Sequence, residues 1–148
     1  MTRLLELAVL YVLFLIQAWL APFGPDLVLI FLLTLSLHEA RLAATLLGAF
    51  AGLCLDLTNP SHLGTNIVAY SAIGYLTASL HGLVYRGRWY LVVLALLGLA
   101  LRAGLHALSG AGLVAPVPLA VSAGLTMLLA VPADLVLGRV FGRRWTTG

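Results

Sequence analysis

Lysine is absent from this chain, charged residues are scarce and cysteine occurs once. Of its 148 residues, 9% are charged and 62% are hydrophobic. A soluble domain usually carries about 25% charged and about 45–50% apolar residues. With so few groups that favour water, the surface of this chain must lie largely in lipid. The single cysteine, Cys54, excludes an intramolecular disulfide framework and a metal site built from several cysteines.

The motifs of common enzymes are missing as well. The chain has no G-x-S-x-G nucleophile elbow, no phosphate loop ending in G-K-[ST] and no GxGxxG fingerprint. His38-Glu39 begins like a zinc-protease motif, but Leu42 occupies the position that needs the second histidine. The arginines form no stripe of the kind that binds nucleic acid. These absences predict a protein that is not an enzyme, with no cofactor, no metal and no nucleic-acid partner.

Apolar segments long enough to span a bilayer, about 17–25 residues in a helix, are abundant. Glycine and proline separate them, and an open strand edge is not tolerated in lipid, so helices are predicted. The prediction is an all-α integral membrane protein, a bundle of six transmembrane helices in a single membrane domain, 1–148. The spans are expected at 4–20, 25–38, 42–57, 66–84, 90–108 and 118–137. The short second span crosses by extending its helix or by local thinning of the bilayer, with a re-entrant pair as the alternative.

The arginines predict the orientation of these spans. With the N-terminus inside, seven of the eight arginines fall on the inner side, and none falls in an outer gap. This is a positive-inside pattern, so both termini of the multi-pass chain are expected in the cytoplasm. Glu6 interrupts the first apolar run and no clean cleavage site follows it, so this run is predicted to be a retained helix rather than a signal peptide.

Ionisable residues within the spans are candidates for function, because charge is costly in lipid. Counted from the inner end at 1.5 Å per residue, Asp56 lies about 21 Å along the third span and Arg102 about 18 Å along the fifth. His106 lies one turn beyond Arg102 on the same face. The matching depths suggest an intramembrane polar cluster of Asp56, Arg102 and His106, with a bridge between Asp56 and Arg102. A solvated helix end, another partner or a ligand are the alternatives for Asp56.

A line of small residues lies on the third span, at Ala44, Gly48 and Gly52. Small residues four apart let two helices approach closely. The line therefore predicts a close helix contact, either within the bundle or with another subunit.

Several short motifs, taken in order, resemble the signature of the rod shape-determining protein MreD family. The pattern is a PDL motif, a hydrophobic run with G-x-x-x-G, a DL pair, a short loop with LG, and GYL. Besides Gly48 and Gly52, the matching residues are Pro25, Asp26, Leu27, Asp56, Leu57, Leu63, Gly64, Gly74 and Tyr75. The resemblance is carried by residues 22 to 80, and elsewhere by the length and the number of spans.

The resemblance implies a non-catalytic scaffold in the bacterial inner membrane, part of the cell-elongation machinery. It implies direct binding of MreC, and a wider complex with the MreB cytoskeleton, RodA and a class B penicillin-binding protein that synthesises peptidoglycan. It also implies a bundle similar in plan to the substrate-binding subunits of energy-coupling-factor transporters.

Two other functions stay open at this point. A substrate-binding subunit of a vitamin-type transporter would use the polar residues of the outer loops, Asp26, Asp56, Asn59, His62, Thr65 and Asn66. Against it, the first span lacks the Ala-x-x-x-Ala line with which such subunits dock their coupling subunit. A protein that moves protons or lipids would use Asp56, Arg102, His106 and Asp134.

Overall fold

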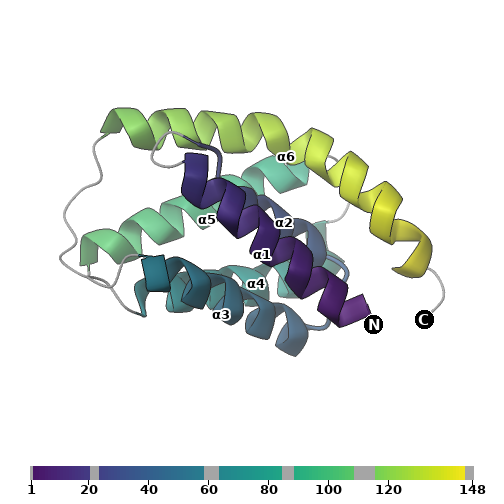
Figure 1. Ribbon diagram of the computed structural model, residues 1–148. Coiled ribbons are helices and arrows are strands. Elements are labelled where there is room, and N and C mark those ends of the chain that lie inside the picture. The colour runs from purple at the N-terminus through teal and green to yellow at the C-terminus, as the bar shows by residue number, and fades with distance from the viewer. Residues whose placement is uncertain (1, 21–23, 59–63, 85–88, 109–115, 146–148) are drawn as a thin grey trace.

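The computed structural model describes residues 2–20, 24–58, 64–84, 89–108 and 116–145, and all regular structure among them is helical. The six helices are α1 (Thr2–Leu20), α2 (Leu27–Ser36), α3 (Arg41–Thr58), α4 (Thr65–Val84), α5 (Trp89–Leu108) and α6 (Pro116–Trp145) (Figure 1). The prediction of six helices is therefore confirmed. Most bounds lie within two residues of the prediction, including the end of α2 at Ser36 instead of 38, whereas α6 continues well beyond 137 to Trp145.

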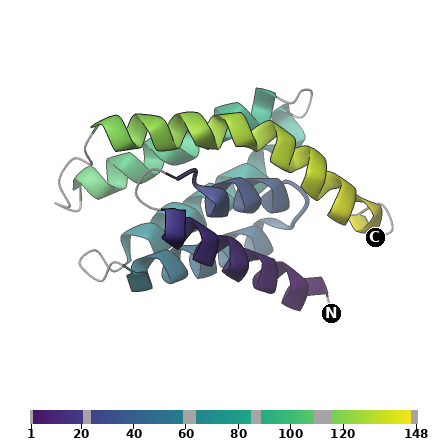
Figure 2. The same ribbon diagram turned by 45° about the horizontal axis from the view of Figure 1, so that its top comes forward.

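α2 is the centre of the bundle. Residues 28–36 of this helix are all buried, and α2 contacts each of the five other helices. Figure 2 shows α2 enclosed between α1, α6 and the α3–α4 pair. A helix that is apolar on all sides needs such complete cover. With ten residues it is about 15 Å long, half the hydrocarbon core of about 30 Å.

α3 and α4 approach each other closely because glycines lie between them. A Cβ atom added at Gly48 would overlap the carbonyl oxygen of Tyr70, and one at Gly52 would overlap that of Asn66. From the other side, a Cβ at Gly74 of α4 would overlap the carbonyl oxygen of Ala44.

The small residues predicted as a contact line therefore pack within the bundle, against α4. Ala44, Gly48 and Gly52 are all buried. The second role considered for this line, contact with another subunit, would require α4 to move away.

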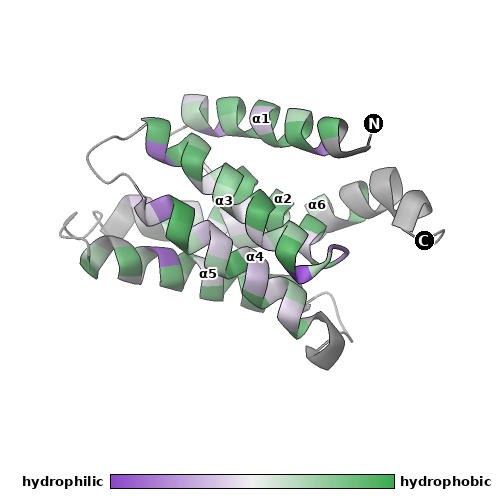
Figure 3. Ribbon diagram, turned by 90° about the horizontal axis from the view of Figure 1, so that it is seen from below, coloured by the Kyte–Doolittle hydropathy of each residue, from purple (hydrophilic) through white to green (hydrophobic). Residues whose placement is uncertain are grey.

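The helix ends and the exposed faces bear on the membrane prediction. By length and composition alone, one helix among the described residues, Arg41–Thr58, qualifies to cross a membrane. The start of α1 and the C-terminal part of α6 lie at the same end of the bundle (Figures 1 and 2), as an even number of passes requires. Apolar residues predominate over α1 and α3 (Figure 3).

Candidate functional site: a buried polar network

Asp26 joins four helices through its backbone and its carboxylate. It precedes α2 as its N-cap and is 2% exposed. Oδ1 accepts a hydrogen bond from the Leu29 N–H at 3.0 Å, and Oδ2 accepts from the Tyr70 hydroxyl and from Arg102 Nη1, each at 2.6 Å. The Asp26 N–H donates to Thr126 Oγ1 at 2.8 Å. Asp26 thus links α2 to α4, α5 and α6.

The start of α2 needs these contacts because it is buried. The first N–H groups of any helix have no partner within the helix, and here there is little water to supply one. The Val28 N–H donates to Gln17 Oε1 of α1 at 2.9 Å, and the Leu27 N–H donates to the Pro25 carbonyl at 3.0 Å. With Asp26 accepting from Leu29, the first turn of α2 is satisfied by side chains and by the preceding turn.

Arg102 of α5 crosses to the N-terminal ends of α2 and α4. Its Nη1 forms an ion pair with Asp26, and its Nε donates to Asn66 Oδ1 at 3.2 Å. The guanidinium carbon lies 5.7 Å from the centroid of the Tyr70 ring, within cation–π range. The Arg102 side chain is 29% exposed, whereas Tyr70 is fully buried.

Asp56 of α3 caps the next helix, α4. It is fully buried. Oδ2 accepts from the N–H groups of Gly64 at 2.8 Å and Ile67 at 3.2 Å. Oδ1 accepts from the Asn66 N–H at 3.2 Å and from Asn66 Nδ2 at 2.8 Å. Gly64 has a φ of +96°, which glycine adopts without strain, and this brings its N–H to the carboxylate.

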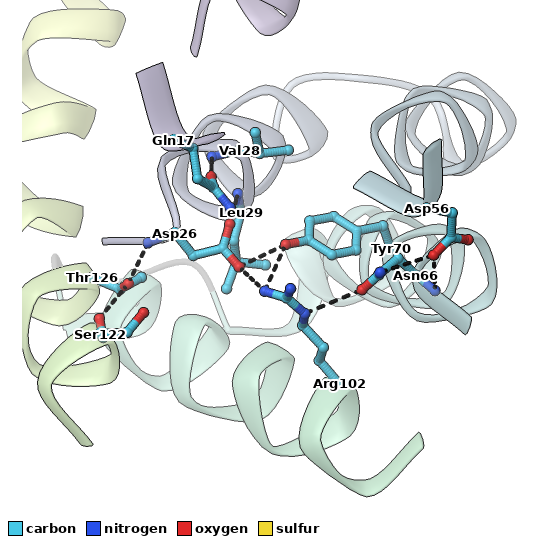
Figure 4. A network of polar contacts seen from close by, with 10 residues as sticks. All are labelled: Gln17, Asp26, Val28, Leu29, Asp56, Asn66, Tyr70, Arg102, Ser122 and Thr126. Carbon is cyan, nitrogen blue, oxygen red and sulfur yellow. Dashed lines mark hydrogen bonds and ion pairs between the residues drawn. The ribbon is translucent and has the colours of Figure 1, made fainter. Parts of the chain in front are cut away.

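Asn66 connects the two carboxylate sites. Its amide nitrogen donates to Asp56 and its amide oxygen accepts from Arg102, so one continuous path runs from Asp26 through Arg102 and Asn66 to Asp56 (Figure 4). With Gln17 and Thr126 at its edge, this network takes in side chains from α1, α3, α4, α5 and α6 and the N-cap of α2.

The charges of the network balance without a bound ion. Asp26, Asp56 and Arg102 together carry one formal negative charge. Each carboxylate accepts N–H groups from the first turn of a helix, Asp26 from α2 and Asp56 from α4. A helix N-terminus is equivalent to about half a positive charge, so the two ends offset the remaining negative charge. The network is therefore suited to holding helices together.

The direct bridge predicted between Asp56 and Arg102 is wrong. Arg102 pairs with Asp26, and Asp56 is reached only through Asn66. The physical reason is how the helices are arranged side by side: α5 packs on α2, α4 and α6, whereas α3 packs chiefly on α4. Equal depth did not place the two side chains face to face. The third residue of the predicted cluster, His106, belongs to α5, but its side chain lies outside the described residues, as does that of Asp134.

Five members of the network were missed from the sequence as network residues, namely Gln17, Asp26, Asn66, Tyr70 and Thr126. Asp26 was considered only as a motif residue and as a ligand candidate. Its place after Pro25 and directly before an apolar run is the signal of an N-cap, which would have put its carboxylate at a helix end. Tyr70 and Thr126 carry no such local signal, because their partners are distant in the sequence.

The motif residues divide into two groups. Gly64 and Gly74 are required by the backbone, and the two aspartates cap helices. In contrast, Leu57 is 68% exposed and Tyr75 is 48% exposed, so the packing of this chain does not account for them. Leu63 lies outside the described residues.

Apart from the polar network, a cavity of about 340 Å³ opens between α1, α2 and α6. Its lining is apolar and includes Leu13, Phe31, Leu129 and Pro132. A site for a vitamin needs several convergent polar groups, which this lining does not offer. No group of three potential metal ligands occurs among the described residues.

Comparison with known protein families identifies a match. The family model of rod shape-determining protein MreD matches residues 1–137, and no curated protein or solved structure matches. The similarity in plan to transporter subunits expected from the sequence therefore has no support among solved structures. The chain belongs to the MreD family, a family of membrane proteins that determine cell shape and are not known as enzymes.

Proposed function

We propose that this MreD-family protein is a non-catalytic scaffold of the bacterial cell-elongation machinery. It binds MreC directly, and so helps to couple the MreB cytoskeleton to RodA and the class B penicillin-binding protein that make peptidoglycan. It spans the inner membrane several times with both termini in the cytoplasm. The family match over residues 1–137 supports the role in rod shape, and the positive-inside pattern supports the orientation.

The observation that supports the scaffold function is that the buried charged groups bind other parts of the same chain. Asp26, Asp56 and Arg102 all bind other parts of the chain. A protein that carries a vitamin, protons or lipids would instead direct such groups toward a cavity or a water-filled path. The cavity between α1, α2 and α6 is apolar, and among the described residues no observation favours either transport alternative.

The partner is proposed to contact motif residues that folding leaves exposed. Tyr75 on α4 and Leu57 on α3 match the family signature yet project from the bundle, 48% and 68% exposed. In lipid, burial of an apolar side chain gives little driving force by itself, so a partner must be held by close packing. A single-span partner such as MreC could pack against such side chains.

The test measures retention of MreC by variants of the full chain extracted in mild detergent. Tyr75→Ala and Leu57→Ala are compared with Leu46→Ala and Val68→Ala. These controls are 61% and 57% exposed on the same two helices but lie outside the motif residues. We expect the motif variants to lose MreC and the controls to keep it, with equal thermal stability for all four.

Cell shape provides the second readout. Depleting the protein in its source bacterium should turn rods into spheres, and the control variants should restore rods better than the motif variants. If all four variants retain MreC equally, the proposed partner face is wrong. If the parent chain neither retains MreC nor affects cell shape, the scaffold function is wrong.

A further inference from the structure

The apolar surface of α1 and α3 is short for a bilayer. Among the described residues, exposed apolar side chains run from Leu4 to Leu20 on α1 and from Leu42 to Leu57 on α3. At 1.5 Å per residue these distances are about 24 Å and about 23 Å along the helix axes. The hydrocarbon core of a typical bilayer is about 30 Å thick.

Polar residues set firm limits to the surface of α3. Arg41 is exposed at one end of this helix and Thr58 is exposed at the other. The whole of α3 from Arg41 to Thr58 is only about 26 Å long, and any tilt reduces its extent along the bilayer normal. The neighbouring α2 is shorter still, with ten residues, and contributes no longer apolar surface beside it.

The cap that Asp56 provides limits how far α3 can extend its apolar surface at its C-terminal end. Asp56 lies two residues before the end of α3 and holds the first turn of α4. An extra apolar turn between Gly52 and this carboxylate would move it out of reach of the Gly64 and Ile67 N–H groups. The way the chain folds therefore fixes the C-terminal end of the α3 surface.

We infer that the α1–α3 face, where MreC does not cover it near Leu57, binds a thinned ring of phospholipid, so that the protein associates preferentially with lipids of short acyl chains. This inference rests on the membrane-spanning topology proposed above. A bilayer meets a short apolar surface by thinning locally, at a cost that grows with each ångström of mismatch. In a membrane of mixed composition the protein therefore collects where the hydrocarbon is thinnest.

The test places the full-length protein in vesicles of phosphatidylcholine with monounsaturated chains of about 14 to about 22 carbons, a series that brackets the usual core of about 30 Å. Quenching of tryptophan fluorescence by brominated lipids gives the relative association of each chain length, since Trp19 at the outer end of α1 is 86% exposed. We expect association to be strongest, by about twofold or more, at the short end of the series.

A lengthened variant tests whether α3 is the cause. Arg41→Leu with Thr58→Leu extends the apolar surface at both ends, and should move the preferred lipid toward longer chains. Thr45→Val is the matched control, because it adds apolar surface to the same helix without lengthening it, and should leave the preference unchanged.

Three results would overturn the inference: a preference of the parent for the longer chains, no preference at all, or an unchanged preference in the lengthened variant. Extraction at high pH distinguishes a failure of this inference from a failure of the proposed membrane-spanning topology. If alkali releases the protein from the vesicles, the protein does not span the membrane and the proposed topology is wrong. If the protein stays inserted but prefers long chains, only the inference about the α1–α3 face is wrong. Neither result depends on MreC.

Discussion

Replacing Arg102 by glutamine should destabilise the bundle through Asp26. The ion pair between Arg102 Nη1 and Asp26 Oδ2 is 2.6 Å long, and Asp26 is 2% exposed. Without the guanidinium, the carboxylate keeps only the Tyr70 hydroxyl and the Leu29 N–H as donors. A buried charge that loses its partner costs the desolvation that the partner had offset.

The magnitude follows from the burial of the pair. Breaking a fully buried ion pair costs about 3–5 kcal/mol. The Arg102 side chain is 29% exposed, so the attraction is partly screened and the lower end, about 3 kcal/mol, is expected. For a chain of this size each kcal/mol lowers the melting temperature by about 2–4 °C, which gives a fall of about 6–12 °C.

Cys54 provides the assay. It is the single cysteine of the chain and is buried, so a thiol-reactive dye reports unfolding in detergent as the temperature rises. The double variant Asp26→Asn/Arg102→Gln should be less destabilised than the sum of its single variants, by about 1 kcal/mol or more.

The control cycle replaces Asp56 in place of Asp26. Asp56 and Arg102 touch only through Asn66, so Asp56→Asn/Arg102→Gln should deviate from additivity by a smaller amount. If the Asp26 cycle is additive within about 0.5 kcal/mol, or if the Asp56 cycle shows the larger coupling, the network does not work as described.

Two further predictions concern the helix pair and the topology. Gly48→Ala should lower the free energy of unfolding by about 1–3 kcal/mol, because the new methyl group meets a backbone carbonyl of α4. Gly104→Ala has open space around it and should be neutral or stabilise the chain by up to about 1 kcal/mol. Thermal unfolding of both variants checks this prediction. In a Cys54→Ala background, Ser61→Cys should react with an impermeant thiol reagent in intact cells and Arg88→Cys should not. The reverse labelling pattern would invert the proposed orientation.

Much of the helix pattern could be predicted from the sequence, because hydropathy and glycine–proline breaks act along the chain. All six helices begin within two residues of the predicted spans, and the residues of the Gly-x-x-x-Gly line, Gly48 and Gly52, lie against α4. These features depend on residues near one another in sequence. Their physical causes, lipid solvation and close backbone approach, need no knowledge of which helices are neighbours.

The partners of the buried charges could not be predicted in this way. The depths of Asp56 and Arg102 were estimated from the helix rise, which says nothing about the direction in which each side chain points or about which helix lies between them. Asn66 of α4 occupies that place. Arg102 and Asp56, which are 36 and 10 residues away from Asn66 in the sequence, meet it there. Only the packing of the five other helices around α2 brings these residues together.

The two carboxylates connect the network to the shape of the membrane surface. Asp26 and Asp56 each bind the first turn of a helix, and Asn66 and Arg102 hold them in one layer, so α2 and α4 must begin at the same level of the bundle. From that level α2 runs for only ten residues before it ends at Ser36, close to the start of α3. This polar layer lies at the C-terminal end of α3 and so ends the apolar surface of that helix there. The buried charges that hold the helices together therefore also fix one end of the apolar surface of α3.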